Sequence, residues 1–246
     1  MSKKKSLISS YELNAVKLFR SSGSAILSTV SAKHEGYPFG SFVTYMSGDC
    51  RTAYLYLSDI AQHTKNLNNN SKSCLTIIKI DSDKQNSERL TLLGDLKLVE
   101  KNKFEECSSK YYEFFPKSKE YAKMHGFNFY QFEISSCRWI GGFGKIAWLK
   151  NEYWNHFEPK WKKNQKAIIE HMNDDHSNSI CSSLHAQYGI EDINAKMLFL
   201  TIDGYYVLSN EKIYFIQFDI TSLNAKQYKD NPVSYTHLRA HETESN

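Results

Sequence analysis

Four side chains that could bind an anion fall close together in the sequence, namely Ser58, His63, Thr64 and Lys65. They lie where an expected strand gives way to an expected helix. Hydroxyl groups, an imidazole N–H and the free backbone N–H groups of a helix N-terminus can together bind a phosphate or a propionate. The residues alone leave a simpler interpretation open, in which Ser58 caps the helix and Thr64 is a surface residue.

A second group with chemical potential is Arg89 and the glycine-rich segment that ends the same part of the chain. The Arg89 guanidinium could pair with a carboxylate or stack on a planar ring, although an ordinary charge on an edge strand is the alternative. Gly141, Gly142 and Gly144 are too many glycines for a regular strand. They mark either a β-bulge or a place where the backbone approaches a ligand, with Lys145 next to them.

The elements that must position these residues follow from the periodicity of apolar side chains. A strand with a bulge at Gly94 is expected over 89–99, and a helix over 104–121 should break at Pro116. Many short strands interrupted by helices suggest a small barrel. The other expected helices are 11–21 and 59–69, and the other expected strands are 25–30, 40–46, 52–57, 74–80, 127–134 and 138–148.

The character of the sequence changes near residue 150, and a length of 246 residues favours two modest domains. One long helix is expected over 167–188, capped by Gly189 and followed by a three-stranded meander with a turn near Ser209. His176 shares the apolar line of this helix with Met172, which predicts a buried, hydrogen-bonded histidine. Five residues apart on one helix, His171 and His176 would point about 140° away from each other and could not share an ion.

These patterns predict a five-part organisation. The final segment continues no helix or strand pattern and resembles an adaptor-derived read-through, so it is set aside. The parts are a flexible N-terminus (1–10), a barrel domain (11–150), a connector (151–165), an α+β module (166–231) and a non-native tail (232–246).

Composition excludes several classes of function. Apolar residues make up 41% of the chain and charged residues 24%, which are ordinary globular values, and the net charge of +4 is weak for a nucleic-acid binder. No apolar run is long enough to span a membrane, so we expect a cytoplasmic chain without a nucleic-acid or membrane partner. The five cysteines lack CxxC spacing and are expected to be free thiols. Hydrolase and kinase motifs are absent.

Three blocks of the sequence together resemble the pyridoxamine-phosphate-oxidase-like superfamily. That resemblance implies a fold that is mainly β with flanking helices, a split β-barrel of the FMN-binding type followed by a small α+β module. It also implies a homodimer with a planar cofactor in the dimer cleft. The blocks are Gly36-Tyr-Pro-Phe-Gly-Ser41, Leu57-Ser-Asp-Ile-Ala-Gln-His-Thr-Lys-Asn-Leu67 and Arg89-Leu-Thr-Leu-Leu-Gly94.

Two further segments, 141–148 and 169–176, resemble the HugZ-type branch, which is linked to haem-iron utilisation, and the whole resemblance covers about residues 11–230. Haem iron is normally held by an imidazole, thiolate, thioether or phenolate. His156 lies in the general region where HugZ-type proteins supply their iron-binding histidine, so it is the candidate axial ligand, with a solvated linker histidine as the alternative. The resemblance assigns the other cofactor contacts to Ser58, His63, Thr64, Lys65, Arg89, Gly142, Gly144 and Lys145.

One departure from the family concerns catalysis. The family's oxygenases carry an acidic residue just before a strand aromatic, where this chain has His125-Gly126-Phe127, and this argues against haem degradation. Three hypotheses result. The first is a haem-binding protein of haem-iron utilisation, whose enzymatic form would open haem with O₂ and external electrons. The second is an FMN-dependent oxidoreductase, and the third is a non-catalytic regulatory or partner-binding protein.

Overall fold

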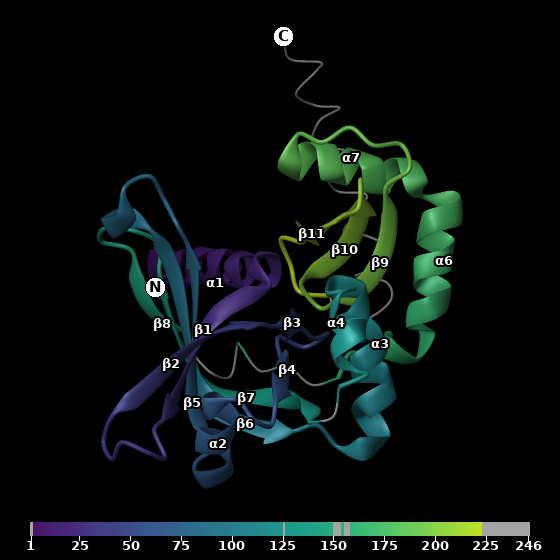
Figure 1. Cartoon of the computed structure of the whole chain (residues 1–246). Coiled ribbons are helices and arrows are strands. Elements are labelled where there is room, and N and C mark those ends of the chain that lie inside the picture. Colours follow the sequence, from purple (N-terminus) through teal and green to yellow (C-terminus); the bar gives the residue numbers. More distant parts are fainter. Residues whose placement is uncertain (1, 125, 150–153, 155–157, 223–246) are drawn as a thin grey trace. The chain divides into compact units, whose positions relative to one another are not determined.

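The computed structural model describes residues 2–124, 126–149, 154 and 158–222. The chain divides into two compact units, residues 1–155 and 156–246 (Figure 1). The boundary lies within the predicted connector, and the division of 151–165 from its neighbours stays a prediction. Among the described residues, none of the helices combines the length and apolar character that a membrane crossing needs.

The first unit is built on an eight-stranded antiparallel sheet of order β2-β1-β5-β6-β7-β4-β3, with β8 paired to β7. β2 and β4 contact each other although four strands lie between them in this order, so the sheet curls on itself. The predicted mainly β barrel is confirmed. Its strands are β1 (Ser24–Val30), β2 (Pro38–Thr44), β3 (Met46–Ser47), β4 (Ala53–Ser58), β5 (Lys72–Lys79), β6 (Glu88–Leu98), β7 (Phe127–Ile140) and β8 (Ile146–Leu149).

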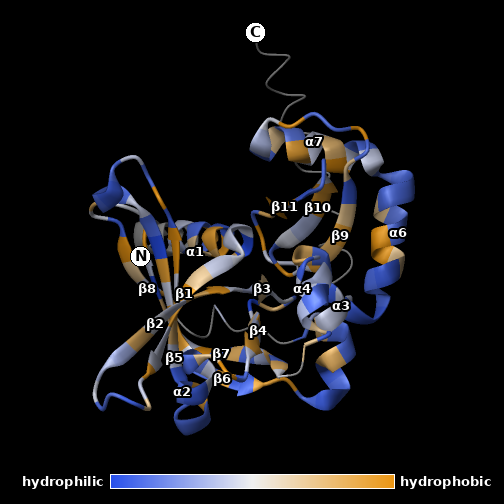
Figure 2. Ribbon diagram, viewed as in Figure 1, coloured by the Kyte–Doolittle hydropathy of each residue, from blue (hydrophilic) through white to orange (hydrophobic). Residues whose placement is uncertain are grey.

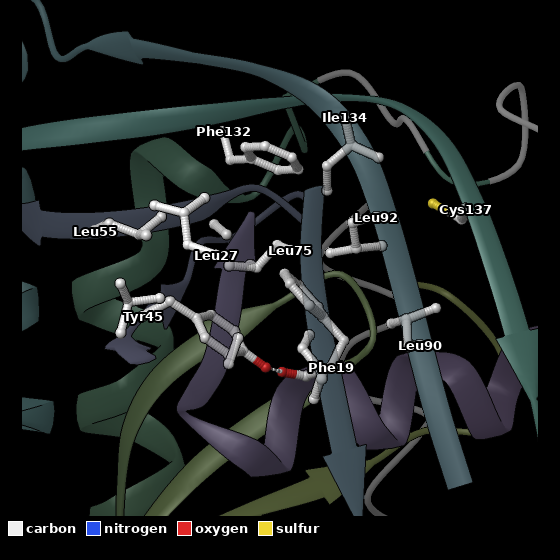
Figure 3. Close-up of a cluster of buried hydrophobic side chains, with 14 of the residues drawn as sticks. Phe19, Leu27, Tyr45, Leu55, Leu75, Leu90, Leu92, Phe132, Ile134 and Cys137 are labelled. Carbon is white, nitrogen blue, oxygen red and sulfur yellow. Dashed lines mark hydrogen bonds between the residues drawn. The ribbon is translucent and has the colours of Figure 1, made fainter. Parts of the chain in front are cut away.

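The inner face of this sheet forms the core, because alternate residues of each strand point inward. Leu27, Leu55 and Leu75 are fully buried there, beside Phe19 from the first helix (Figure 3). The Tyr45 hydroxyl donates a hydrogen bond to the Phe19 carbonyl oxygen at 2.6 Å. Figure 2 shows apolar residues concentrated along these strands. Each buried Leu or Phe side chain stabilises the fold by about 1.5–3 kcal/mol.

The helices of the first unit are α1 (Ser2–Ser22), α2 (Gln62–Asn69), α3 (Phe104–Phe114) and α4 (Ser118–Tyr121), with short 3₁₀ turns at Lys84–Asn86 and Lys101–Lys103. α1 packs against β5 and β6 and begins nine residues before the predicted start at Tyr11. The predicted break of the 104–121 helix at Pro116 is confirmed, since α3 ends and α4 begins on either side of it.

Two anchors hold α1 and the end of this unit. The Glu12 carboxylate accepts an ion-paired hydrogen bond from buried Arg51 at 2.7 Å. The same guanidinium lies over the ring of Trp154, which is fully buried and packs edge-on against Phe19. Charge pairing and aromatic packing therefore tie α1, the start of β4 and Trp154 together.

The second unit contains α6 (Gln165–Asp175), α7 (Ser177–Tyr188), a 3₁₀ turn (Lys162–Asn164) and a three-stranded antiparallel sheet of β9 (Lys196–Thr201), β10 (Gly204–Ser209) and β11 (Lys212–Gln217). The predicted meander is confirmed, with Asn210 and Glu211 at positive φ in its turn. Gly189, at φ +69°, follows α7 as predicted. In Figure 2 most of α6 is hydrophilic.

The prediction of one helix over 167–188 is wrong, because the helix breaks at His176 (φ −130°, ψ 25°). His176 is exposed rather than buried, so its predicted structural role is wrong as well. The break also removes the expected angular separation, and the rings of His171 and His176 lie 4.9 Å apart, edge to face. The His171 imidazole instead pairs with Asp175 through Nδ1 at 2.7 Å.

Gly94 occupies the predicted bulge, where the register between β6 and β7 shifts after Leu93. A Cβ at Gly94 would collide with the backbone carbonyl of Glu133, whereas a Cβ at Gly40 in β2 would make only an ordinary contact with Ile26 at 3.7 Å. Gly94→Ala should therefore lower the free energy of unfolding by about 1–3 kcal/mol through overpacking. The matched variant Gly40→Ala should change it little. Urea unfolding of both checks this, and equal effects would contradict it.

Candidate functional site

A cavity of about 690 Å³ lies in the first unit, between the middle of β2, the end of β4, the start of α2 and the connection from α3 to α4. Its volume is within the range of about 300–1,000 Å³ that cofactor sites occupy. Aromatic side chains dominate the lining, and polar groups are fewer. The aromatic residues are Phe42, Tyr56, Phe114, Phe115, Tyr121 and Phe127, and the polar ones are Thr44, Ser58, His63, Lys117 and Ser118.

The aromatic lining is held rigid by ring-to-ring packing. Tyr56 stacks on Phe129 with a centroid distance of 4.3 Å, and Tyr121 stacks on Phe127 at 5.5 Å. Tyr56 and Phe127 join the two pairs at 5.2 Å. Burial raises the pKa of the Tyr56 phenol, which therefore stays protonated at neutral pH. Fixed aromatic faces of this kind suit a planar, largely apolar ligand.

His63 brings an imidazole to the cavity wall. Its Nε2 atom is buried and has no hydrogen-bond partner among the described residues. Burial lowers the pKa of the His63 imidazole below its ordinary value, so the ring is neutral at neutral pH. A buried polar atom without a partner is uncommon in folded proteins and points to a group that pairs with something else.

The hydrogen bonds of Asn66, one turn further along α2, fix the position of His63. Its side-chain Oδ1 accepts from the backbone N–H of Ala32 at 3.0 Å and from Gln62 at 2.9 Å, while Nδ2 donates to Thr29 at 2.9 Å. Asn66 is fully buried. These bonds attach α2 to the end of β1 and hold the start of the helix in place.

The simpler interpretation of the 58–65 segment is wrong in two respects. Ala61, not Ser58, is the N-cap residue of α2, and no side chain caps the helix. Thr64 is only 1% exposed, with an unpartnered buried hydroxyl among the described residues. Ser58 and His63 both line the cavity, whereas Lys65 is exposed on α2 and lies outside the lining.

Arg89 lies away from the cavity lining. It belongs to β6, which is flanked by β5 and β7, so the edge-strand interpretation is wrong. Its neighbours across the sheet are Ile78 and Ile140. Because Leu90 next to it is fully buried, Arg89 points to the outer face of the sheet.

The glycine-rich segment forms a tight turn between β7 and β8. A Cβ at Gly141 would meet the Trp139 ring, and Gly142 at φ +98° lies against the Asn86 side chain, which accepts a hydrogen bond from Phe143 N–H at 3.1 Å. Gly144 is at φ +77°. The turn and the packing of Trp139 account for these glycines without a ligand. Lys145 lines a separate polar cavity of about 280 Å³ beside Trp139.

The cavity gains several residues that the sequence patterns did not single out, chiefly Tyr56, Tyr121 and the segment from Phe114 to Ser118. The Phe-Phe-Pro sequence after a helix was the available signal. His156 and His125 lie outside the described residues, so the assignment of His156 as iron ligand stays a prediction. Within the described part of the chain, His, Cys, Asp and Glu side chains do not assemble a metal site of three or more ligands.

A curled antiparallel sheet with a cofactor-sized aromatic cavity defines a split-barrel protein. More narrowly, the chain matches the CREG β-barrel family over residues 12–156 and belongs to that family. The resemblance to split-barrel proteins is thereby confirmed.

Relatives of known name extend this picture. The chain is 31% identical over 187 residues to the non-canonical haem oxygenase HOZ of Arabidopsis thaliana, a chloroplastic protein. The match covers 74% of this chain and 58% of that relative, so the chain spans little more than half of its length. The predicted cytoplasmic location therefore stays a prediction.

Two solved structures share the fold. A protein of unknown function from Agrobacterium tumefaciens superimposes with a TM-score of 0.72 at 15% identity, covering 91% of this chain and 94% of its own. A haem-binding protein from Mycobacterium smegmatis superimposes with a TM-score of 0.53 at 21% identity, covering 93% and 98%.

The neutral state of His63 has a consequence for stability. Because its folded pKa is lowered, the unfolded chain binds more protons than the folded chain in mild acid, and stability must fall as pH falls. His63→Gln removes this contribution. Between about pH 7.5 and pH 5.5, the variant should lose less unfolding free energy than the wild type in urea titrations. The exposed-turn variant His34→Gln is the control and should behave as the wild type, and an unchanged acid loss in His63→Gln would refute the expectation.

Proposed function

We propose that the chain is a haem-binding split-barrel protein of haem-iron utilisation and that the macrocycle occupies the aromatic cavity of the first unit. The observation that carries this proposal is the lining itself, with stacked aromatic rings, little charge and an unpartnered buried imidazole nitrogen. The named relatives include a haem oxygenase and a haem-binding protein, which supports the same ligand class.

The charges around the cavity favour haem over FMN. A flavin mononucleotide carries a phosphate of nearly two negative charges, which proteins hold with several donors or cations. The charged side chain in the lining is Lys117, which is exposed, and His63 is neutral. Lys65 and Arg89, the cations expected at a phosphate, lie outside the lining. A large apolar ring whose carboxylates reach Lys117 suits these residues better.

Haem supplies an iron that can bind and activate O₂, and the protein supplies binding, orientation and electrostatics. In this chain, Tyr56, Tyr121 and Phe127 would hold the ring by stacking, and Lys117 would pair with a propionate. The protonated Tyr56 phenol could hold a proton at the cavity wall. Ring opening with external electrons is an extension of the proposal that rests on the HOZ relative, and the missing acid before Phe127 argues against it.

Absorbance titration of the purified protein with haemin, and separately with FMN, tests the ligand. We expect a saturable Soret shift with haemin and weaker binding of FMN. Ala61→Trp should fill the cavity and weaken haemin binding about tenfold or more, which corresponds to at least about 1.4 kcal/mol. Ala32→Trp, at an exposed position, is the matched control and should bind as the wild type.

Tight FMN binding with nonspecific haemin uptake would replace the proposal with the flavin oxidoreductase hypothesis. Binding of neither ligand would favour the non-catalytic, partner-binding hypothesis. Equal haemin affinity in Ala61→Trp and the wild type would place any haem site elsewhere.

The proposal includes a homodimer that forms through the outer face of the sheet. The outer face of a solvated antiparallel sheet is normally polar, but this one exposes large apolar side chains. Phe42 is 70% exposed and Trp148 is 61% exposed. One row across the outer face runs Phe42, Ile26, Thr76, Thr91, Arg138 and Trp148, and a neighbouring row runs Ile78, Arg89, Ile140 and Ile146.

A second copy is the occupant that this face favours, because self-complementary two-fold interfaces are the commonest in soluble oligomers. Phe42 also lines the cavity, so a partner on the outer face would border the ligand. Arg89 and Arg138 lie within the two rows and would become part of the interface, where Arg is enriched.

The dimer is tested by light scattering on a sizing column. We expect the wild type to elute as a dimer at micromolar concentration and the double variant Ile26→Glu with Trp148→Glu to elute as a monomer, since two buried charges oppose the contact. Ile60→Glu, 82% exposed and off the outer face, should remain dimeric. A monomeric wild type would exclude this part of the proposal.

A further inference from the structure

We propose that His63 is an axial ligand of the haem iron, so that the barrel itself, through the start of α2, holds the metal. This inference rests on the proposed function and deepens it by naming the residue that meets the iron. The sequence patterns assigned His63 to an anion, whereas its surroundings in the fold fit a metal better.

The first argument is position. His63 is the histidine that lines the cavity among the described residues, and it faces the same space as Tyr56 and Phe127. Those two rings contact each other at 5.2 Å and form part of the aromatic wall. A planar macrocycle stacked on that wall would bring its metal centre within reach of groups on the α2 side.

The second argument is the state of the ring. The Nε2 atom of His63 is buried and unpartnered among the described residues, so no hydrogen bond competes for its lone pair. Proteins rarely leave such an atom without a partner. Neutral imidazole is the form that binds metals, and imidazole is the commonest haem ligand from globins to peroxidases.

The third argument is the lack of a better donor in the described lining. The Tyr56 phenol is kept protonated by burial, and an ammonium such as that of Lys117 has no lone pair to offer. Ser58 and Ser118 carry hydroxyls, which are poor ligands for haem iron compared with imidazole.

The fourth argument is rigidity. The Asn66 side chain makes three hydrogen bonds that fix α2 to β1, and Leu67 on the next position is buried in the barrel core. His63 is one turn before both residues. An imidazole on a fixed helix start costs little ordering when it binds, which favours ligation.

The experiment compares haemin with metal-free protoporphyrin IX on the full chain. An iron ligand matters only when iron is present, whereas a wall residue matters for both rings. His63→Gln, which keeps a polar side chain of similar size, should weaken haemin binding about tenfold or more and shift the Soret band. It should leave the affinity for protoporphyrin IX, measured by fluorescence, close to that of the wild type.

Controls separate this inference from the proposed function. Imidazole added to haemin-loaded His63→Gly should restore the wild-type Soret position. His34→Gln should change nothing, and His156→Ala should keep the part of the spectrum that His63→Gln loses.

The inference is overturned if His63→Gln keeps the wild-type haemin spectrum and affinity while Ala61→Trp still blocks haemin, in which case the haem proposal stands alone. Equal weakening of both rings in His63→Gln also overturns it, because His63 would then be a packing residue. If neither Ala61→Trp nor His63→Gln affects haemin uptake, the cavity does not bind haem and the proposed function fails first.

Discussion

The closure of one antiparallel sheet around a single apolar core is the constraint on which the first unit depends. Residues on the inner side of each strand, such as Leu27, Leu75 and Leu92, are buried together, and Phe19 from α1 covers them. That burial requires β2 and β4 to approach each other although they are distant in the sheet order. Their approach in turn brings Phe42, Val43 and Thr44 opposite the end of β4 and so creates one side of the cavity.

The remaining walls of the cavity depend on polar and aromatic contacts rather than on the core. Asn66 bonds α2 to β1, and this sets the wall that carries His63. Stacking of Tyr121 on Phe127 fixes the wall formed by α4 and β7. Tyr111, buried between these parts, bonds the Thr44 hydroxyl at 2.8 Å and packs against Phe115. The result is a rigid aromatic chamber with one unpaired imidazole nitrogen, which is the feature that the functional proposal uses.

Cations and cavity are separated in this fold, and that separation bears on the choice of ligand. Arg89 and Arg138 lie on the outer face, where Arg138 lies over the Trp148 ring at 5.7 Å. Lys65 is exposed, and Lys145 lines a different cavity. A cofactor held mainly by charge would need these groups in the chamber, whereas an apolar ring does not. The same separation gives the outer face a mixture of apolar side chains and arginines that suits contact with another protein surface.

The sequence by itself determined the local structure wherever a chemical signal is strong and short in range. Alternation predicted the strands, Gly94 predicted the bulge, Pro116 predicted the break between α3 and α4, and the family blocks identified the split barrel. The helix break at His176 was missed, because its apolar line continues through the break and periodicity alone cannot detect a change of direction.

Only the tertiary structure decided which of the candidate residues meet. The cavity draws its lining from β2, β4, the start of α2, the α3–α4 connection and β7, segments separated by tens of residues, and no pattern within one segment reports that they converge. It also decided that Arg89 faces outward, since strand alternation sets two faces but the burial of the neighbouring Leu90 sets which one is inside. Spacing along the chain fixes local conformation, whereas the assembly of a site depends on long-range packing of side chains.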